Sequence, residues 1–157
     1  MSSRRIRNLA AAFSLACVTT AVTYAETLEP EDSIVARRAV MRVISLNFAP
    51  LVAMAKEEIP FDAQTFRTNA ERMALVSSMP VADYFVDGTD VDVGEAKTEA
   101  LPEIWLDWEN FSDKLETMRR EVADLSVIAQ SGDADALKNQ VIETADACKD
   151  CHDAFRR

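Results

Sequence analysis

The chain has 157 residues, of which 48 % are hydrophobic, and a net charge of −10 at neutral pH. This length and composition predict an ordinary globular protein and exclude fibrous and wholly disordered classes. The negative charge argues against nucleic acid or an anionic membrane as a partner, because both repel an acidic surface. With one histidine and three cysteines in the chain, few side chains are left for metal binding or histidine-dependent catalysis.

The first 25 residues have the pattern of an export signal. Three arginines precede an apolar run over residues 9–22, and Ala25 supplies a small residue at the predicted cleavage position. A transmembrane anchor is the alternative, but the run is shorter than the roughly 20 strongly apolar residues that a span requires. Cleavage would leave residues 26–157 as one domain without a membrane span. Because only bases are lost, its net charge becomes −13.

The first two helices are predicted over residues 31–58 and 62–79. In the first, apolar residues recur every seven positions, as an amphipathic helix requires: Ile34, Met41, Phe48 and Ala55. Pro50 falls inside this pattern and predicts a bend rather than a break. Asp62 is suited to cap the second helix.

A long connection and two further helices follow. Residues 80–100 lack periodicity and predict a connection with one short helical turn over 82–86. The third helix is predicted from Pro102 to Ile128. The fourth begins at the capping residue Asp133 and ends at Phe155. The fold class is therefore all-α, an antiparallel four-helix bundle whose core positions can line a cofactor site.

The chemistry of the chain is concentrated near its C-terminus. Cys148-Lys149-Asp150-Cys151-His152 has the C-x-x-C-H spacing of covalent haem c attachment, in which two thiols add to the haem vinyl groups and the imidazole binds the iron. On a helix, these three side chains lie on one face within one turn. The motif therefore predicts one haem c, attached through Cys148 and Cys151 with His152 as an axial iron ligand.

Three other uses of the two cysteines compete with haem. A thioredoxin-type redox pair requires a preceding strand, which the sequence does not predict. A structural zinc site requires four ligands, whereas the exported chain offers two thiols and one imidazole. A disulfide leaves the adjacent histidine unexplained. Because haem is attached to exported chains that have not yet folded, the haem interpretation also favours the general secretory route over twin-arginine export of a folded protein.

The mature chain resembles the cytochrome c-prime family of class II c-type cytochromes, which includes the low-spin cytochrome c-556 branch. The resemblance rests on the C-terminal haem motif with Asp153-Ala154-Phe155-Arg156 after it, and on the segment from Ala96 to Trp105. It implies a periplasmic electron-transport or gas-binding haem protein. With no second histidine in the sequence, and hence no further Ser–His pair, we expect that the protein is not an enzyme. The implied partners are nitric oxide, carbon monoxide, redox proteins and a second copy of the chain in a homodimer.

The resemblance also implies roles for residues outside the motif. Arg37 is expected near a haem propionate, and Arg156 beside the His152 face of the haem. Phe155 stands where the family often has tyrosine, so a hydrogen bond from that position is lost. Candidate porphyrin contacts, whose other interpretation is core packing, are Phe48, Met73, Trp105 and Trp108.

Met41 separates two functional hypotheses. As a lid over an open iron site, it implies a five-coordinate, high-spin iron that binds diatomic gases. As a sixth ligand, it implies a low-spin electron carrier of the cytochrome c-556 kind. The third-helix segment is closer to the high-spin members, so we expect the open site.

Overall fold

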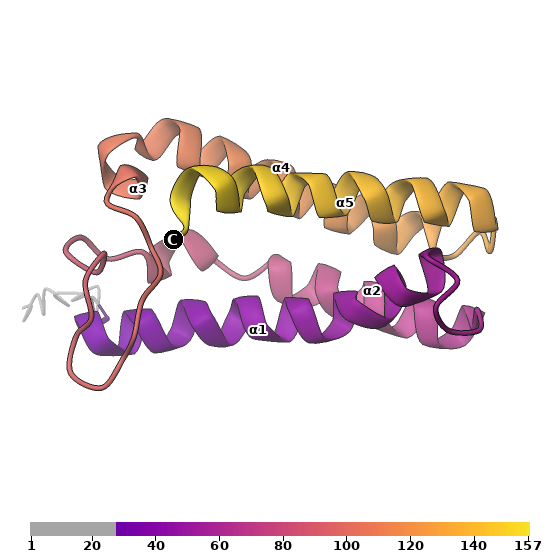
Figure 1. Cartoon of the computed structure of the whole chain (residues 1–157), viewed down its shortest axis with the longest axis horizontal. Coiled ribbons are helices and arrows are strands. Elements are labelled where there is room, and N and C mark those ends of the chain that lie inside the picture. Colours follow the sequence, from indigo (N-terminus) through magenta and orange to yellow (C-terminus); the bar gives the residue numbers. More distant parts are fainter. Residues whose placement is uncertain (1–27) are drawn as a thin grey trace, which may run out of the picture.

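The computed structural model describes residues 28–157, so the predicted export signal and its cleavage position lie outside the described residues. Four long helices form the bundle: α1 (Pro30–Ala55), α2 (Ala63–Ser77), α4 (Trp108–Ile128) and α5 (Ala134–Phe155). Two short helices, η1 (Val81–Tyr84) and α3 (Glu103–Leu106), lie in the connection between α2 and α4. Consecutive long helices run antiparallel, with α1 and α2 in one layer and α4 and α5 in the other (Figure 1). The predicted all-α four-helix bundle is confirmed.

Two predicted helix caps are present. The Asp62 carboxylate accepts a hydrogen bond from the Thr65 backbone N–H at 2.6 Å, at the start of α2. The Asp133 carboxylate accepts from the N–H groups of Asp135 and Ala136, at 3.1 and 3.0 Å. Because the first N–H groups of a helix have no partner inside it, these carboxylates set where α2 and α5 begin.

The first helix is continuous through Pro50 but ends at Ala55, three residues before the predicted end. The Glu58 N–H donates to the Ala53 carbonyl and the Glu57 N–H to the Met54 carbonyl, at 2.9 and 3.0 Å. This is the hydrogen-bond pair of a Schellman motif, and it places Glu57 at φ 61°. Glycine usually occupies that position, so the sequence carried no stop signal here.

The third helix is not the single helix predicted from Pro102 to Ile128. It breaks at Asp107, whose backbone has φ −133° and ψ 59°, and α4 starts at the next residue. Asp107 caps α4, since its carboxylate accepts from the Asn110 backbone N–H at 3.4 Å and from the Asn110 side-chain amide at 3.1 Å. Aspartate is a favoured N-cap, and here the cap overrides an apolar pattern that runs on unbroken.

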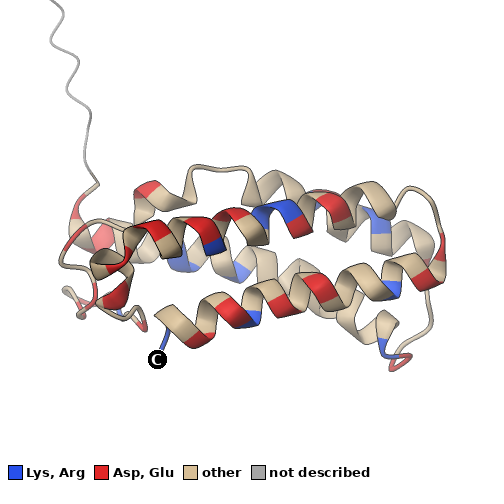
Figure 2. Cartoon of the chain, turned by 90° about the horizontal axis from the view of Figure 1, so that it is seen from above, with Lys and Arg blue, Asp and Glu red and all other residues tan. Residues whose placement is uncertain are grey.

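The long connection crosses one end of the bundle, at the left of Figure 1, where the C-terminus also lies. Its short helical turn is η1, at Val81–Tyr84 rather than over 82–86. Between residues 83 and 113 the sequence holds ten acids and one lysine. Acidic residues accordingly crowd this end of the ribbon in Figure 2.

The core runs the length of the bundle between the two layers. Its fully buried side chains come from all four long helices and from η1 and α3, among them Ile34, Leu51, Phe66, Met73, Val81, Ile104, Val122 and Leu125. Among the described residues, α1 is the one helix long and apolar enough to cross a membrane by length and composition. A helix that contributes to a soluble core passes the same test, so this observation carries little weight.

Candidate haem site

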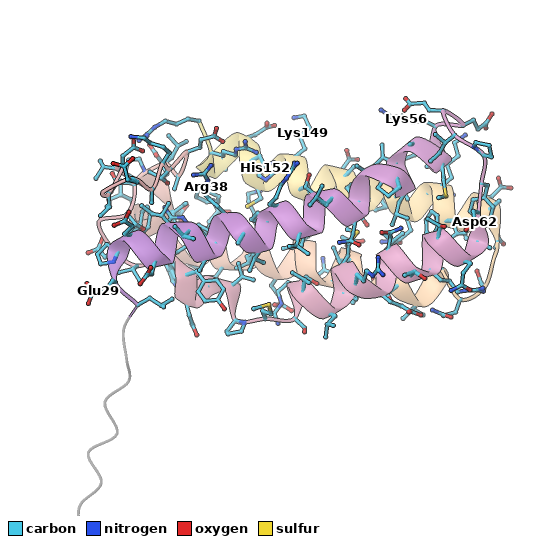
Figure 3. All side chains as sticks on the ribbon, turned by 90° about the horizontal axis from the view of Figure 1, so that it is seen from below. Glu29, Arg38, Lys56, Asp62, Lys149 and His152 are labelled. Carbon is cyan, nitrogen blue, oxygen red and sulfur yellow. The ribbon has the colours of Figure 1, made fainter. Side chains whose placement is uncertain are left out.

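The C-x-x-C-H motif occupies the last two turns of α5. Cys148 and Cys151 are half-buried and pack against the hydrophobic core, whereas the neighbouring His152 is exposed. Their spacing on one continuous helix places the two thiols and the imidazole on one side of α5. Figure 3 shows His152 and Arg38 of α1 in the same half of the bundle.

Burial controls the protonation of the motif. It raises the pKa of the Cys148 thiol to about 11, with a further contribution from Cys151, and it also raises the pKa of Cys151 against the opposing effect of Lys114. Both thiols are free, so the structure shows no disulfide between them. The imidazole of His152 is exposed on one side only, and its partial desolvation by the protein, followed by the charge of Arg156, lowers the pKa of His152. The imidazole is therefore neutral at pH 7, which is the state that binds a metal ion.

The end of α5 is held by the segment that precedes α3. The Leu101 N–H donates to the Phe155 carbonyl at 3.0 Å, and the Arg157 N–H donates to the Glu99 carbonyl at 2.9 Å. The Arg156 side chain makes a salt bridge with the Glu99 carboxylate, with Nη2 and Oε2 2.5 Å apart. The turn after His152 is thus fixed by contacts that the sequence did not predict.

Arg37 lies at the same end, buried to 4 % exposure beneath the long connection. Its Nη1 donates to the Thr89 hydroxyl at 2.5 Å, and its Nη2 donates to the Thr98 hydroxyl at 2.7 Å. Its guanidinium carbon also lies 5.1 Å from the centre of the Phe85 ring and 6.0 Å from that of Trp105. Desolvation lowers the Arg37 pKa to about 10, so the group remains charged at pH 7.

The other candidate residues divide into two groups. Met41, Phe48 and Trp105 are partly buried and pack against the core, and the Trp105 indole N–H donates to the Phe85 carbonyl at 3.0 Å. Met73 is fully buried, whereas Trp108 is 42 % exposed.

The sequence did not predict that three residues of the long connection, Thr89, Thr98 and Glu99, contact the helices at this end of the bundle. No spacing in the sequence marks them, because their contacts to α1 and α5 span more than 50 positions. The only available signal was that the segment from Ala96 to Trp105 looked family-like, and this did not assign a task to any one side chain.

The residues present suit a covalently attached haem. Two free thiols of one helix face an apolar core, and a neutral imidazole follows them directly. In addition, α5 packs mainly on α4 and α1 mainly on α2, so the two helices that carry the motif and Met41 make few contacts with each other. When bound, the haem supplies an iron that changes oxidation state and takes axial ligands.

A helical bundle with a C-x-x-C-H motif at the end of its last helix defines a bundle-type c-type cytochrome. The comparisons specify the family. The Cytochrome C' family model matches residues 32–156, and a cytochrome c' of Halomonas halodenitrificans is 38 % identical over 130 residues, which cover 82 % of this chain and 98 % of the relative. The chain belongs to the cytochrome c' family and binds haem c covalently through cysteines.

Further relatives bear on function and assembly. A cytochrome c-554 of Cereibacter sphaeroides is 30 % identical over 155 residues, which cover 98 % of each chain. A nitric oxide complex of a cytochrome c prime variant from Alcaligenes xylosoxidans aligns with TM-score 0.72 and 31 % identity, covering 84 % of this chain and 98 % of that one. A cytochrome c' with a ligand-controlled dimer dissociation aligns with TM-score 0.77 and 26 % identity, covering 82 % and 97 %.

Proposed function

We propose that this protein is a periplasmic mono-haem cytochrome with a five-coordinate, high-spin iron that binds diatomic gases such as nitric oxide and carbon monoxide. The observation that carries the proposal is the C-terminal C-x-x-C-H motif, which contains the only histidine of the chain. His152 is therefore the single imidazole available to the iron. The nitric oxide complex of the Alcaligenes relative supports gas binding on this scaffold.

In this proposal, each candidate residue has a defined task. Cys148 and Cys151 form the thioethers, His152 binds the iron, and the flexible apolar side chain of Met41 covers the opposite side as a lid. Small neutral gases can pass between apolar side chains because they carry no charge to desolvate. Apolar contacts to the porphyrin come from Phe48, Met73 and Trp105.

Arg37 and Arg156 serve the periphery of the haem. Arg156 caps the C-terminal end of α5, and its backbone N–H donates to the His152 carbonyl at 3.0 Å. Arg37 uses both terminal nitrogens for Thr89 and Thr98. It therefore reaches a propionate through Nε, or by exchanging one threonine for the carboxylate. In either case the pairing is charge-assisted and stronger than a neutral hydrogen bond.

The export pattern of residues 1–25 supports the periplasm as the location, with cleavage near Ala25. We also propose that the protein is a carrier or gas-binding protein rather than an enzyme, since no nucleophile and base pair accompanies the motif within residues 28–157. A homodimer fits the exposed apolar side chains of the α1–α2 layer: Val35, Val43, Leu46, Leu75 and Met79. Redox proteins are the partners that a transfer role requires.

A second candidate function is electron transfer by a six-coordinate, low-spin iron with Met41 as the sixth ligand. A protein named cytochrome c-554, rather than cytochrome c', also aligns over 98 % of this chain, so a cytochrome of another description shares this sequence pattern. A methionine thioether on iron raises the reduction potential and fills the position where a gas would bind. The two candidates therefore differ in the role of Met41, which is not bound to the iron in the first and is the sixth ligand in the second.

Optical and electron paramagnetic resonance spectra of the purified holoprotein test the proposal. We expect a high-spin ferric iron, and a ferrous protein whose spectrum shifts at once when carbon monoxide is added. A low-spin ferric iron with the absorption band of a sulfur-to-iron bond contradicts the proposal and assigns Met41 as a ligand. Electron exchange with a quinol-linked partner then becomes the activity to measure.

A further inference from the structure

The salt bridge between Glu99 and Arg156 connects the long connection with the helix that carries the haem motif. Arg156 Nε donates to Glu99 Oε2 at 2.6 Å, and Nη2 lies 2.5 Å from the same oxygen. Both side chains are more than half exposed, at 61 % for Glu99 and 52 % for Arg156. An exposed ion pair contributes little to stability, so its effect must be sought in where it places charge.

The backbone keeps this pair together. An isolated bridge joins Ala100 to Arg156, and the Arg157 N–H donates to the Glu99 carbonyl at 2.9 Å. The two side chains therefore leave adjacent backbone positions, and little conformational freedom is lost when they pair. A salt bridge between two long side chains on unconnected loops would lack this advantage.

Arg156 also lies directly beside the iron ligand of the proposed function. Its backbone N–H donates to the His152 carbonyl at 3.0 Å, and Arg156 is the extended residue that caps the C-terminal end of α5. This hydrogen bond keeps the Arg156 backbone within one turn of His152 at the end of the helix. A guanidinium that is free to move could lie against the imidazole or against the haem. One that is tied to Glu99 is held at the connection, with its charge balanced.

We propose that Glu99 is a positioning residue that acts through Arg156: it fixes the guanidinium and neutralises its charge beside the His152 side of the haem. The inference rests on the proposed function only in taking His152 as an iron ligand, and it holds whether or not Met41 is the sixth ligand. The consequence is electrostatic. Loss of Glu99 leaves an unbalanced positive charge near the iron, which favours the ferrous state and raises the reduction potential.

The test compares Glu99→Ala with Glu103→Ala in the holoprotein. Glu103 is an exposed acid at the same end of the bundle and makes no salt bridge among residues 28–157, so it controls for the loss of one negative charge. We expect Glu99→Ala to raise the midpoint potential more than Glu103→Ala and to shift the iron–histidine stretching band of the ferrous protein. Circular dichroism should show unchanged helix content in both variants.

A double-mutant cycle with Arg156→Gln shows whether Glu99 acts through Arg156. We expect the additional effect of Glu99→Ala to vanish in the Arg156→Gln background, leaving only a shift like that of Glu103→Ala. Equal effects of Glu99→Ala in both backgrounds overturn the inference, because Glu99 would then act only as a general negative charge. An iron–histidine band that is absent from the unsubstituted protein would instead mean a six-coordinate iron and contradict the proposed open site, whereas the midpoint potentials of the double-mutant cycle would still decide the role of Glu99.

Discussion

The Arg37 guanidinium donates hydrogen bonds to both the side chain and the backbone of Thr89. Nη1 donates to the Thr89 hydroxyl and Nη2 to the Thr89 carbonyl, each at 2.5 Å. The two residues are 52 positions apart. The Thr89 hydroxyl in turn donates to the Val86 carbonyl at 2.6 Å. One buried arginine of α1 therefore organises the long connection, and this end of the bundle depends on a polar network rather than on apolar packing alone.

Arg37→Ala should destabilise the protein by about 3 kcal/mol, because it leaves the buried oxygens of Thr89 and Thr98 without their donor. Arg37→Lys should recover only part of this loss, since an ammonium cannot replace the planar fork of a guanidinium. Urea unfolding of the holoprotein measures both effects. The matched control is Arg38→Ala, which removes one exposed hydrogen bond to the Lys97 carbonyl. Equal losses for Arg37→Ala and Arg38→Ala would contradict the organising role.

Met41→Ala should accelerate carbon monoxide association about ten-fold, which corresponds to removing roughly 1.4 kcal/mol of barrier. The physical reason is that the substitution removes a flexible side chain from the path to the iron. The ferric spin state should stay high-spin in both proteins. Stopped-flow mixing and electron paramagnetic resonance measure the two quantities. A change from low-spin to high-spin iron on substitution would mean that Met41 is a ligand.

Replacing both Cys148 and Cys151 by alanine should abolish covalent attachment, so that haem is extracted into acidified organic solvent. Either single variant should keep one thioether and retain its haem through the same extraction. The mass of the intact chain measures the bound group. The apoprotein should also unfold at a lower temperature, because a ligand that binds only the folded state stabilises it. Cys17→Ala is the control, since the predicted cleavage removes that residue.

Asp62 should make the stability of the protein sensitive to acid. Hydrogen bonds from Thr65 lower the pKa of the capping carboxylate below its ordinary value of 3.8. A depressed pKa in the folded state stabilises the protein above pH 3.8 and loses this effect as the pH falls through the lowered value. Asp62→Asn should keep the cap and flatten the pH profile in this range. Thermal unfolding from pH 2 to 7 measures this, and an unchanged profile contradicts it.

Leu46→Glu should convert the proposed homodimer to a monomer. Leu46 is 56 % exposed and lies on the same side of α1 as Val35 and Val43. A carboxylate facing its own copy across a symmetric interface adds like-charge repulsion and desolvation. Sedimentation velocity measures the mass, and Val127→Glu on α4 is a matched control at an exposed apolar position. If the unsubstituted protein is itself a monomer, the proposed homodimer is wrong.

The sequence predicted the four long helices well where each boundary has a local signal. Asp62 and Asp133 begin helices because a carboxylate satisfies unpaired N–H groups within three residues. The ends at Ala55 and Asp107 were missed because Glu57 takes a left-handed conformation without glycine, and because a cap interrupts an apolar pattern that continues past it.

The haem motif was readable from the sequence for the same reason, since Cys148, Cys151 and His152 lie within one helical turn and their spacing alone states their chemistry. The net charge of the chain and its numbers of cysteines and histidines are likewise known from the sequence without the tertiary structure. What only the tertiary structure decided is how α1, the long connection and the end of α5 meet. Arg37 with Thr89 and Thr98, and Arg156 with Glu99, are pairs separated by more than 50 positions. No local periodicity encodes such pairs, because the packing of the two helical layers brings them together.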